Sequence, residues 1–163
     1  MNETIDTNVT LVPFIKEDTV EYLKLANEVE VGKFFKLAYC RNKSEANDII
    51  DLFTTSEDYI AFKILNCKNQ FVGAIVGEKK EKKKTIEISY FIGKDYRGRR
   101  YCENAIIEYA KHIAKNFSQK YRCLEFCISI INYSSKKVMN TLGIKLAYTR
   151  GYAHYRCPVK NLI

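Results

Sequence analysis

The stretch from Thr85 to Ile131 constrains the fold most, because it has the pattern of a strand, a basic loop, a long helix and a second strand. Thr85–Ile92 is rich in β-branched and aromatic residues, and Leu124–Ile131 is nearly all apolar, as buried strands are. Between them, apolar residues recur at helical spacing over four turns from Cys102 to Phe117. A strand that returns to its sheet through such a helix lies parallel to the first strand. The sheet must therefore contain a parallel pair.

Shorter patterns on either side of this unit complete the expected sheet. The expected strands are Val9–Phe14, Tyr59–Leu65, Phe71–Val76, Lys145–Thr149 and His154–Pro158, and the expected helices are Glu17–Glu30, one beginning near Ser44, and Ser134–Leu142. The charged segment at residues 77–84 is typical of a hairpin turn. The sequence thus predicts an α/β fold in which about four helices flank a mixed, mostly antiparallel sheet of seven strands.

Length and composition restrict the class of protein. The chain has 163 residues and no Pro-, Gly- or Ser-rich linker, which predicts one domain at 1–163. Its 47% hydrophobic and 28% charged residues exclude a disordered chain, a coiled coil and collagen. The N-terminus lacks the pattern of a secretory signal, and every apolar run is too short to cross a bilayer. We expect a cytoplasmic protein that does not insert into membranes.

Cysteine usage and net charge narrow the possible partners. The six cysteines form no CxxC or CxxH pair and only two histidines occur, so we expect no metal site and reduced cysteines that serve as small hydrophobic residues. The formal net charge of +8 favours an anionic partner. Nucleic acid, a phosphorylated cofactor and a membrane surface all satisfy that condition, and the charge alone does not choose among them.

The segment IGKDYRGRRYCENA, residues 92–105, has the features of a phosphate site. It joins a strand to the N-terminus of the strongest helix, where unpaired N–H groups and the positive end of the helix dipole attract anions. Arg97, Arg99 and Arg100 add forked donors that match phosphate oxygens. The alternative is a solvated basic turn, which is the common role of such a cluster, but the strand–loop–helix context favours a phosphate cradle.

The segment INYSSKKVMNTLGI, residues 131–144, places polar groups where a buried strand ends and a short helix begins. Asn132 and Ser135 are the candidates there for contact with a ligand. Taken alone, Asn132 is explained equally by capping of the helix N-terminus.

Four segments in order carry a resemblance to a known family. They are LVPFIKEDTVEYLKLANE, QFVGAIVGE with Gly73, IEISYFIGKDYRGRRYCENAI, and NYSS followed by VMNTLGI. Together they resemble the GNAT superfamily of acyl-CoA-dependent N-acyltransferases. They are most similar to the branch that includes the ribosomal-protein N-acetyltransferases.

The resemblance implies that acetyl-CoA binds where the strands Thr85–Ile92 and Leu124–Ile131 splay apart at the centre of the sheet. The pantetheine arm would pair with the first of these strands, and the pyrophosphate would bind the loop that follows. The cofactor-binding residues implied in this way are Phe91, Ile92, Arg97, Gly98, Arg99, Arg100, Tyr101, Cys102, Asn132 and Ser135. Two residues depart from the family pattern, because Arg100 replaces a glycine and Cys102 replaces a glycine or alanine. These departures concern the affinity for the cofactor rather than the fold.

The resemblance also implies catalytic roles. Glu87 is the candidate base, with pairing to a lysine or exposure to solvent as the alternative. Many family members place a tyrosine acid at the position of Met139, which cannot donate a proton. Ser135 is then the candidate acid, with helix capping as its alternative role.

Three functions remain after this reading. The first is an acetyl-CoA-dependent N-acetyltransferase that transfers an acetyl group to a primary amine, on a small molecule or a protein N-terminus, by direct attack in a ternary complex. The second is a non-catalytic acyl-CoA-binding module, which Arg100 and Met139 favour. The third, a basic nucleic-acid-binding protein, ranks last because the aromatic and basic residues that would serve it fall within the cofactor loop. We expect a monomer or a homodimer.

Overall fold

The computed structural model describes residues 6–163 and shows a seven-stranded sheet in the order β1-β2-β3-β4-β5-β7-β6. The strands are β1 (Val9–Pro13), β2 (Tyr59–Asn66), β3 (Phe71–Lys80), β4 (Thr85–Ile92), β5 (Cys123–Ser129), β6 (Leu146–Arg150) and β7 (Tyr152–Pro158). The helices are α1 (Thr19–Ala26), α2 (Val29–Phe34), α3 (Lys43–Thr55), α4 (Tyr101–Phe117) and α5 (Tyr133–Thr141). Only β4 and β5 are parallel, so the predicted mixed and mostly antiparallel fold is confirmed.

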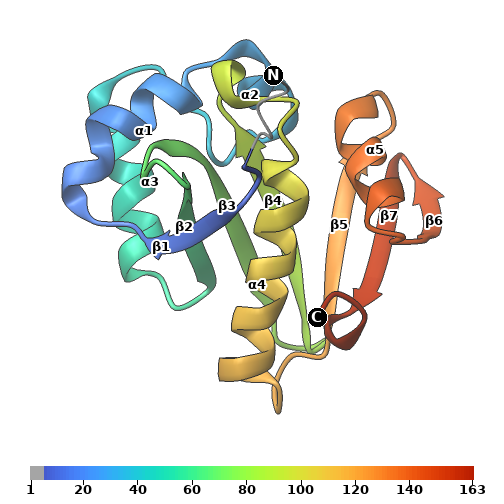
Figure 1. Ribbon diagram of the computed structural model, residues 1–163. Coiled ribbons are helices and arrows are strands. Elements are labelled where there is room, and N and C mark those ends of the chain that lie inside the picture. The colour runs from blue at the N-terminus through green and yellow to red at the C-terminus, as the bar shows by residue number, and fades with distance from the viewer. Residues whose placement is uncertain (1–5) are drawn as a thin grey trace.

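Helices cover the two faces of the sheet, and two hydrophobic clusters form the core (Figure 1). The side chains of Ile86, Ile88 and Ile92 on β4 pack with the buried stripe of α4. Phe91 points to the other face and packs in the cluster built around α1, α2 and α3. This alternation along β4 places each side chain of the strand in a defined layer.

The segment predicted as one helix at Glu17–Glu30 forms two, α1 and α2, so residues 6–163 contain five α-helices where about four were predicted. The break occurs at Glu28, whose backbone is extended at φ −105° and ψ 146°. Its carboxylate accepts a hydrogen bond from Lys94 N–H at 2.7 Å and pairs with Arg97. A contact with a distant loop therefore ends the periodic helix that the sequence predicts.

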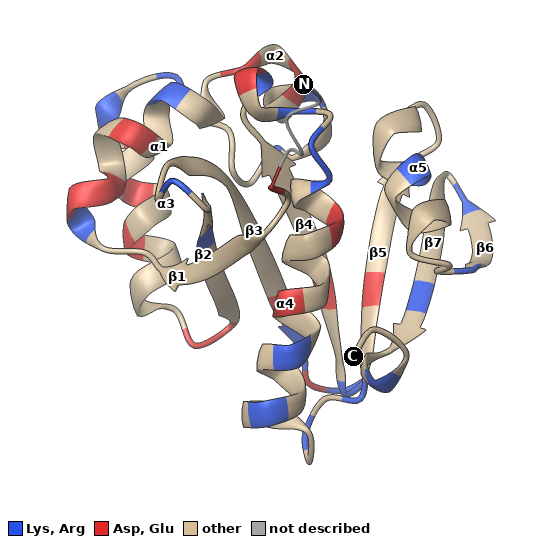
Figure 2. Ribbon diagram, in the orientation of Figure 1, with Lys and Arg blue, Asp and Glu red and all other residues tan. Residues whose placement is uncertain are grey.

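Two strand ends also differ from the sequence prediction. β3 continues to Lys80 because its last residues pair with the start of β4, which leaves a shorter turn at residues 81–84. β5 ends at Ser129, and Ile130 and Ile131 are exposed in the turn before α5. The lysine-rich turn lies at the opposite end of the molecule from the basic loop that enters α4 (Figure 2).

Candidate active site

The parallel strands at the centre of the sheet separate along their length. β4 and β5 pair only at their first residues, where Thr85–Glu87 faces Cys123–Glu125. β4 then continues to Ile92 without a partner on that side, which leaves backbone N–H and C=O groups available to a ligand. The splayed pair that the sequence predicts is therefore confirmed.

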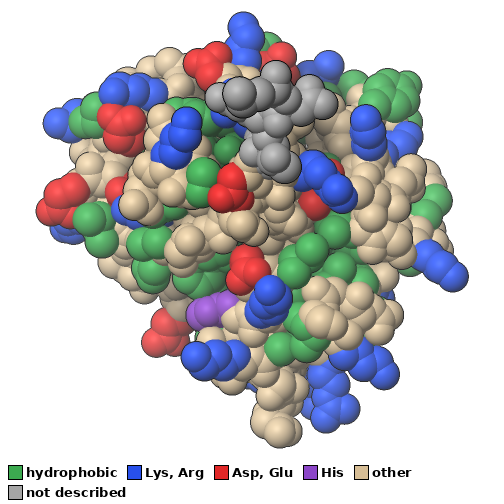
Figure 3. Space-filling view, viewed as in Figure 1, with side chains coloured by type: hydrophobic (Ala, Val, Ile, Leu, Met, Phe, Trp, Pro, Cys, Tyr) green, Lys and Arg blue, Asp and Glu red, His purple; other side chains and the backbone are tan. Residues whose placement is uncertain are grey.

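A cavity of about 750 Å³ opens at this separation. Its walls on one side are the loop 97–102 and the first half of α5, and on the other side Val31 and Phe34 of α2 and Phe35, which follows α2. The cavity therefore lies between the strands and is lined by residues from both layers of helices. Hydrophobic side chains are also exposed between α4 and the C-terminal elements (Figure 3). A smaller cavity of about 350 Å³ between β1 and α4 shares no residue with this one.

The loop that enters α4 is shaped to bind an anion. Gly98 and Arg100 both have left-handed backbones, with φ of 76° and 61°. Arg100 is the N-cap residue of α4, and no described side chain caps the helix there. The first helical hydrogen bond runs from Asn104 N–H to the Arg100 carbonyl at 3.2 Å, so the N–H groups of Tyr101–Glu103 point out of the helix end. Arg100 thus adopts the conformation for which glycine is usual, and its side chain is exposed.

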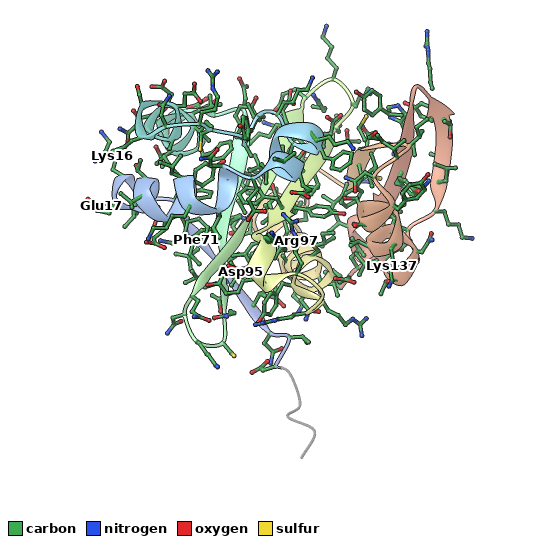
Figure 4. All side chains as sticks on the ribbon, turned by 90° about the horizontal axis from the view of Figure 1, so that it is seen from above. Lys16, Glu17, Phe71, Asp95, Arg97 and Lys137 are labelled. Carbon is green, nitrogen blue, oxygen red and sulfur yellow. The ribbon has the colours of Figure 1, made fainter. Side chains whose placement is uncertain are left out.

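Arg97 joins this loop to α2. Its Nε donates to the Ile92 carbonyl at 2.9 Å, and its guanidinium pairs with Glu28 and lies 3.8 Å from Glu30. Seen from above, Arg97 lies near α2, whereas Lys137 lies on the far side, at α5 (Figure 4). Within residues 6–163, Arg99 and Arg100 make no ion pair. These two arginines, rather than Arg97, are available to a phosphate.

The start of α5 brings Asn132 and Ser135 to the cavity. The Asn132 side-chain oxygen accepts a hydrogen bond from Ser135 N–H at 3.2 Å, which is N-terminal capping, and both residues line the cavity. The two roles considered for Asn132 are compatible, because the capping bond fixes the turn that presents the Ser135 hydroxyl. Phe91, Ile92 and all six predicted residues of the loop 97–102 also line the cavity.

Tyr90 on β4 also lines the cavity, and its hydroxyl is buried without a hydrogen-bond partner. Thr85 Oγ1 is the one other such side-chain atom in the described part of the chain. An unsatisfied buried hydroxyl costs about 1–3 kcal/mol. Burial, followed by the nearby Cys102, raises the pKa of the phenol, so Tyr90 stays protonated and is a donor. Nothing in the sequence marks Tyr90 as a site residue, because an aromatic residue in a strand is usually explained by packing.

The comparisons with known proteins identify the family. The profile of the Acetyltransferase (GNAT) domain matches residues 8–145, which is most of the chain. The chain belongs to the GNAT acetyltransferase family. The resemblance found in the sequence is therefore confirmed, and the fold is an acetyl-CoA-binding fold.

Solved structures share the fold of this GNAT protein at low sequence identity. A GNAT-family acetyltransferase from Bacillus anthracis is 16% identical with a TM-score of 0.79, covering 94% of this chain and 96% of that one. Spermidine N-acetyltransferase from Vibrio cholerae, in complex with CoA and spermine, is 10% identical with a TM-score of 0.80, covering 96% and 98%. The ribosomal L7/L12 α-N-protein acetyltransferase RimL is 15% identical with a TM-score of 0.78, covering 94% and 92%. No curated protein sequence matches this chain.

The residues of this GNAT cavity fit acetyl-CoA. Within the described residues, the N-terminus of α4 has no side-chain cap and Arg99 and Arg100 make no ion pair, so these groups suit phosphates, and the open edge of β4 suits an amide-containing arm. The unpartnered Tyr90 hydroxyl is a further donor for a bound molecule. Burial raises the pKa of Cys102 to about 12, so this thiol remains neutral beside the loop.

Glu87 lies at the edge of the cavity rather than in its wall. It faces Glu78 on β3 and Glu125 on β5 in register, at the last pair before the strands separate. Cys127 lines the cavity, and the pKa of its thiol is raised, first by burial and second by the nearby Glu87. Lys80 pairs with Glu78 at 2.7 Å. The role of Glu87 as a base therefore stays a prediction.

Met139 is fully buried and packs in the hydrophobic cluster around α4. It does not line the cavity, so its side chain is a core residue. Across residues 6–163 there is no cluster of three or more His, Cys, Asp or Glu residues able to hold a metal. No helix in that range is long and apolar enough to span a membrane.

Proposed function

We propose that this GNAT protein is an acetyl-CoA-dependent N-acetyltransferase that transfers the acetyl group directly to a primary amine. The observation that carries the proposal is the cavity that runs between β4 and β5, from the basic loop on one side to α2 on the other. Such a passage lets an acyl donor and an acceptor occupy the site together, as direct attack in a ternary complex requires.

The cofactor loop would hold the donor by its phosphates. Arg99 and Arg100 supply positive charge, and the N–H groups at the start of α4 supply hydrogen bonds. The unpaired edge of β4 at Phe91 and Ile92 would hold the pantetheine arm. Acetyl-CoA supplies the activated acyl group. The protein supplies binding, orientation and proton transfer.

Two residues are proposed to carry the protons. The attacking amine loses a proton, and the departing sulfur gains one. Ser135 faces the cavity from the first turn of α5 and is proposed as the acid. Glu87 lies just outside the wall and is proposed as the base, receiving the proton through a bridging water.

The acceptor is proposed to be a small-molecule amine or a protein N-terminus. Phe34, Phe35 and Glu30 line the side of the cavity through which it would enter. That wall suits a cationic group with an apolar neighbour. Acetyltransferases of spermidine and of a ribosomal protein share this fold, which supports an amine acceptor.

The cellular setting and assembly are also proposals. All six cysteines are free, which supports a reducing, cytoplasmic compartment. A monomer or a homodimer is proposed, and light scattering would distinguish them.

The test is release of free CoA thiol in the presence of peptides, polyamines, amino acids and aminoglycosides. We expect turnover with at least one amine and a fall in kcat of about a hundredfold in Ser135→Ala, the lower end of the effect of losing an acid. Ser44→Ala, in the first turn of α3 and outside the cavity, is the matched control and should change kcat little. Binding of acetyl-CoA with no turnover on any amine would instead support a non-catalytic acyl-CoA-binding module.

A further inference from the structure

Tyr90 has a hydroxyl that forms no hydrogen bond of normal geometry within residues 6–163, although the Ser135 side chain lies close to it. The residue lies on β4, three positions beyond the last pair that β4 forms with β5. Its side chain packs on the face of the sheet that α4 covers, and it lines the cavity. The oxygen is buried and makes no hydrogen bond. A buried donor without a hydrogen bond is accounted for if a bound molecule accepts a hydrogen bond from it.

The groups around the phenol come from three elements. Cys102 and Glu103 face it from the first turn of α4, Ser135 from the first turn of α5, and Tyr155 from β7. Tyr90 therefore lies between the starts of the two helices that border the cavity. Burial is the largest influence and raises the pKa of the phenol, with smaller contributions in the same direction from Cys102, Glu103 and Tyr155, whereas the Ser135 side chain lowers it. The net shift is upward, so the phenol stays neutral.

We propose that the Tyr90 phenol donates a hydrogen bond to the sulfur of the bound thioester and stabilises that sulfur as the acyl group leaves. The inference rests on the proposed function and assigns a catalytic contact to a residue to which the family resemblance gives no role. It also accounts for Met139. If Tyr90 on β4 supplies the hydrogen-bond donor, the residue at position 139 of α5 need not be a donor and can pack in the core.

The path of the cavity places the reacting end of the donor near Tyr90. The phosphates bind at the loop 97–102, and the acceptor enters beside α2, so the acyl group must lie where the cavity passes between β4 and β5. Tyr90 faces that passage from the side of the cofactor loop, beside Ser135. The Tyr90 hydroxyl is therefore expected to lie next to the thioester of the bound acyl donor.

The step balances without a further reagent. The amine nitrogen forms a bond to the carbonyl carbon, the carbon–sulfur bond breaks, and its electron pair goes to sulfur. The proton lost by the amine passes through water to Glu87, and the sulfur receives a proton from Ser135, which regains one from solvent. Tyr90 keeps its own proton throughout, since its raised pKa lies above that of an ordinary thiol at ~8.5, and it acts only as a donor.

The test compares the binding of CoA and desulfo-CoA, which lacks the sulfur, by calorimetry at pH 8.5 in wild type and Tyr90→Phe. We expect the substitution to weaken CoA binding about tenfold, as loss of a hydrogen bond to a charged group does, and to leave desulfo-CoA unchanged. The melting temperature should rise, because the substitution removes a buried hydroxyl that makes no hydrogen bond in the free protein.

Tyr109→Phe is the matched control. Tyr109 is also a buried tyrosine, but its hydroxyl donates to the Ile60 carbonyl at 2.9 Å. This variant should lose thermal stability and keep the wild-type difference between CoA and desulfo-CoA.

Two results would overturn the inference. Equal weakening of CoA and desulfo-CoA in Tyr90→Phe would place the phenol on the pantetheine arm and not on the sulfur. Unchanged binding of CoA would show that the hydroxyl has no ligand contact. If the wild-type protein bound neither molecule, the proposed function would itself fail, which is a different result from either of these.

Discussion

Gly73 on β3 controls how closely β3 can approach β4 beside the cavity. A Cβ atom at this position would lie 2.2 Å from the Phe91 carbonyl oxygen and 2.8 Å from Ile92 Cδ1. Atoms in ordinary contact lie about 3.5 Å apart, so Gly73→Ala requires a shift of about 1 Å between the two strands. The first contact is with backbone, which cannot rotate away as a side chain can.

The cost follows from that displacement. Overpacking in a core costs about 1–3 kcal/mol, and a clash with a backbone carbonyl places Gly73→Ala at the upper end. For a chain of this length, about 3 kcal/mol corresponds to a fall in melting temperature of roughly 6–12 °C. Thermal unfolding followed by circular dichroism measures this change.

The same shift should weaken the cofactor site. Phe91 and Ile92 line the cavity, and a displacement of about 1 Å at a binding edge can cost up to a hundredfold. We expect acetyl-CoA affinity to fall at least tenfold in Gly73→Ala, measured by calorimetry well below its melting temperature.

Gly77→Ala provides the control on the same strand. Its Cβ would meet the Tyr109 hydroxyl at 2.1 Å and Ile86 Cγ2 at 2.4 Å, and none of these residues lines the cavity. This variant should lose stability but keep acetyl-CoA affinity. Wild-type stability and affinity in Gly73→Ala would refute the reasoning, and so would equal losses of affinity in the two variants.

Three further predictions concern charge, capping and pH. Glu28→Gln should tighten acetyl-CoA binding about threefold to fivefold, because it removes a carboxylate that competes with phosphate for Arg97. Calorimetry measures this change, and weaker binding would contradict the prediction. Asn132→Ala should lower the free energy of unfolding by about 1 kcal/mol and reduce turnover, whereas Asn42→Ala, which removes the matching cap of α3, should cost stability alone in denaturant titrations. Burial, followed by Lys115, lowers the pKa of His112, so the contribution of the neutral ring to stability is present above about pH 6.5 and is lost as the pH falls through the lowered pKa. Unfolding of His112→Gln should show a smaller loss between pH 7.5 and pH 5.5, and an unchanged pH dependence would exclude this account.

The central features of this GNAT protein could be predicted from the sequence because they depend on local patterns. The period of the apolar residues from Thr85 to Ile131 requires a strand, a helix and a parallel strand. Gly98 and the arginines beside it mark an anion-binding loop by residue type alone. The polar residues at the start of α5 were predicted for the same reason, since Asn132 is a preferred cap.

Only the tertiary structure decided which polar groups remain available to a ligand. Arg97 appears equivalent to Arg99 in the sequence, but Glu28 comes from a segment nearly seventy residues away and pairs with it. The same contact ends α1 and separates it from α2. Tyr90 has the sequence signature of a core residue, and its proposed role depends on a buried hydroxyl that makes no hydrogen bond within residues 6–163. Periodicity reports which face of an element is buried, whereas the pairing of polar groups depends on long-range contacts that no local pattern contains.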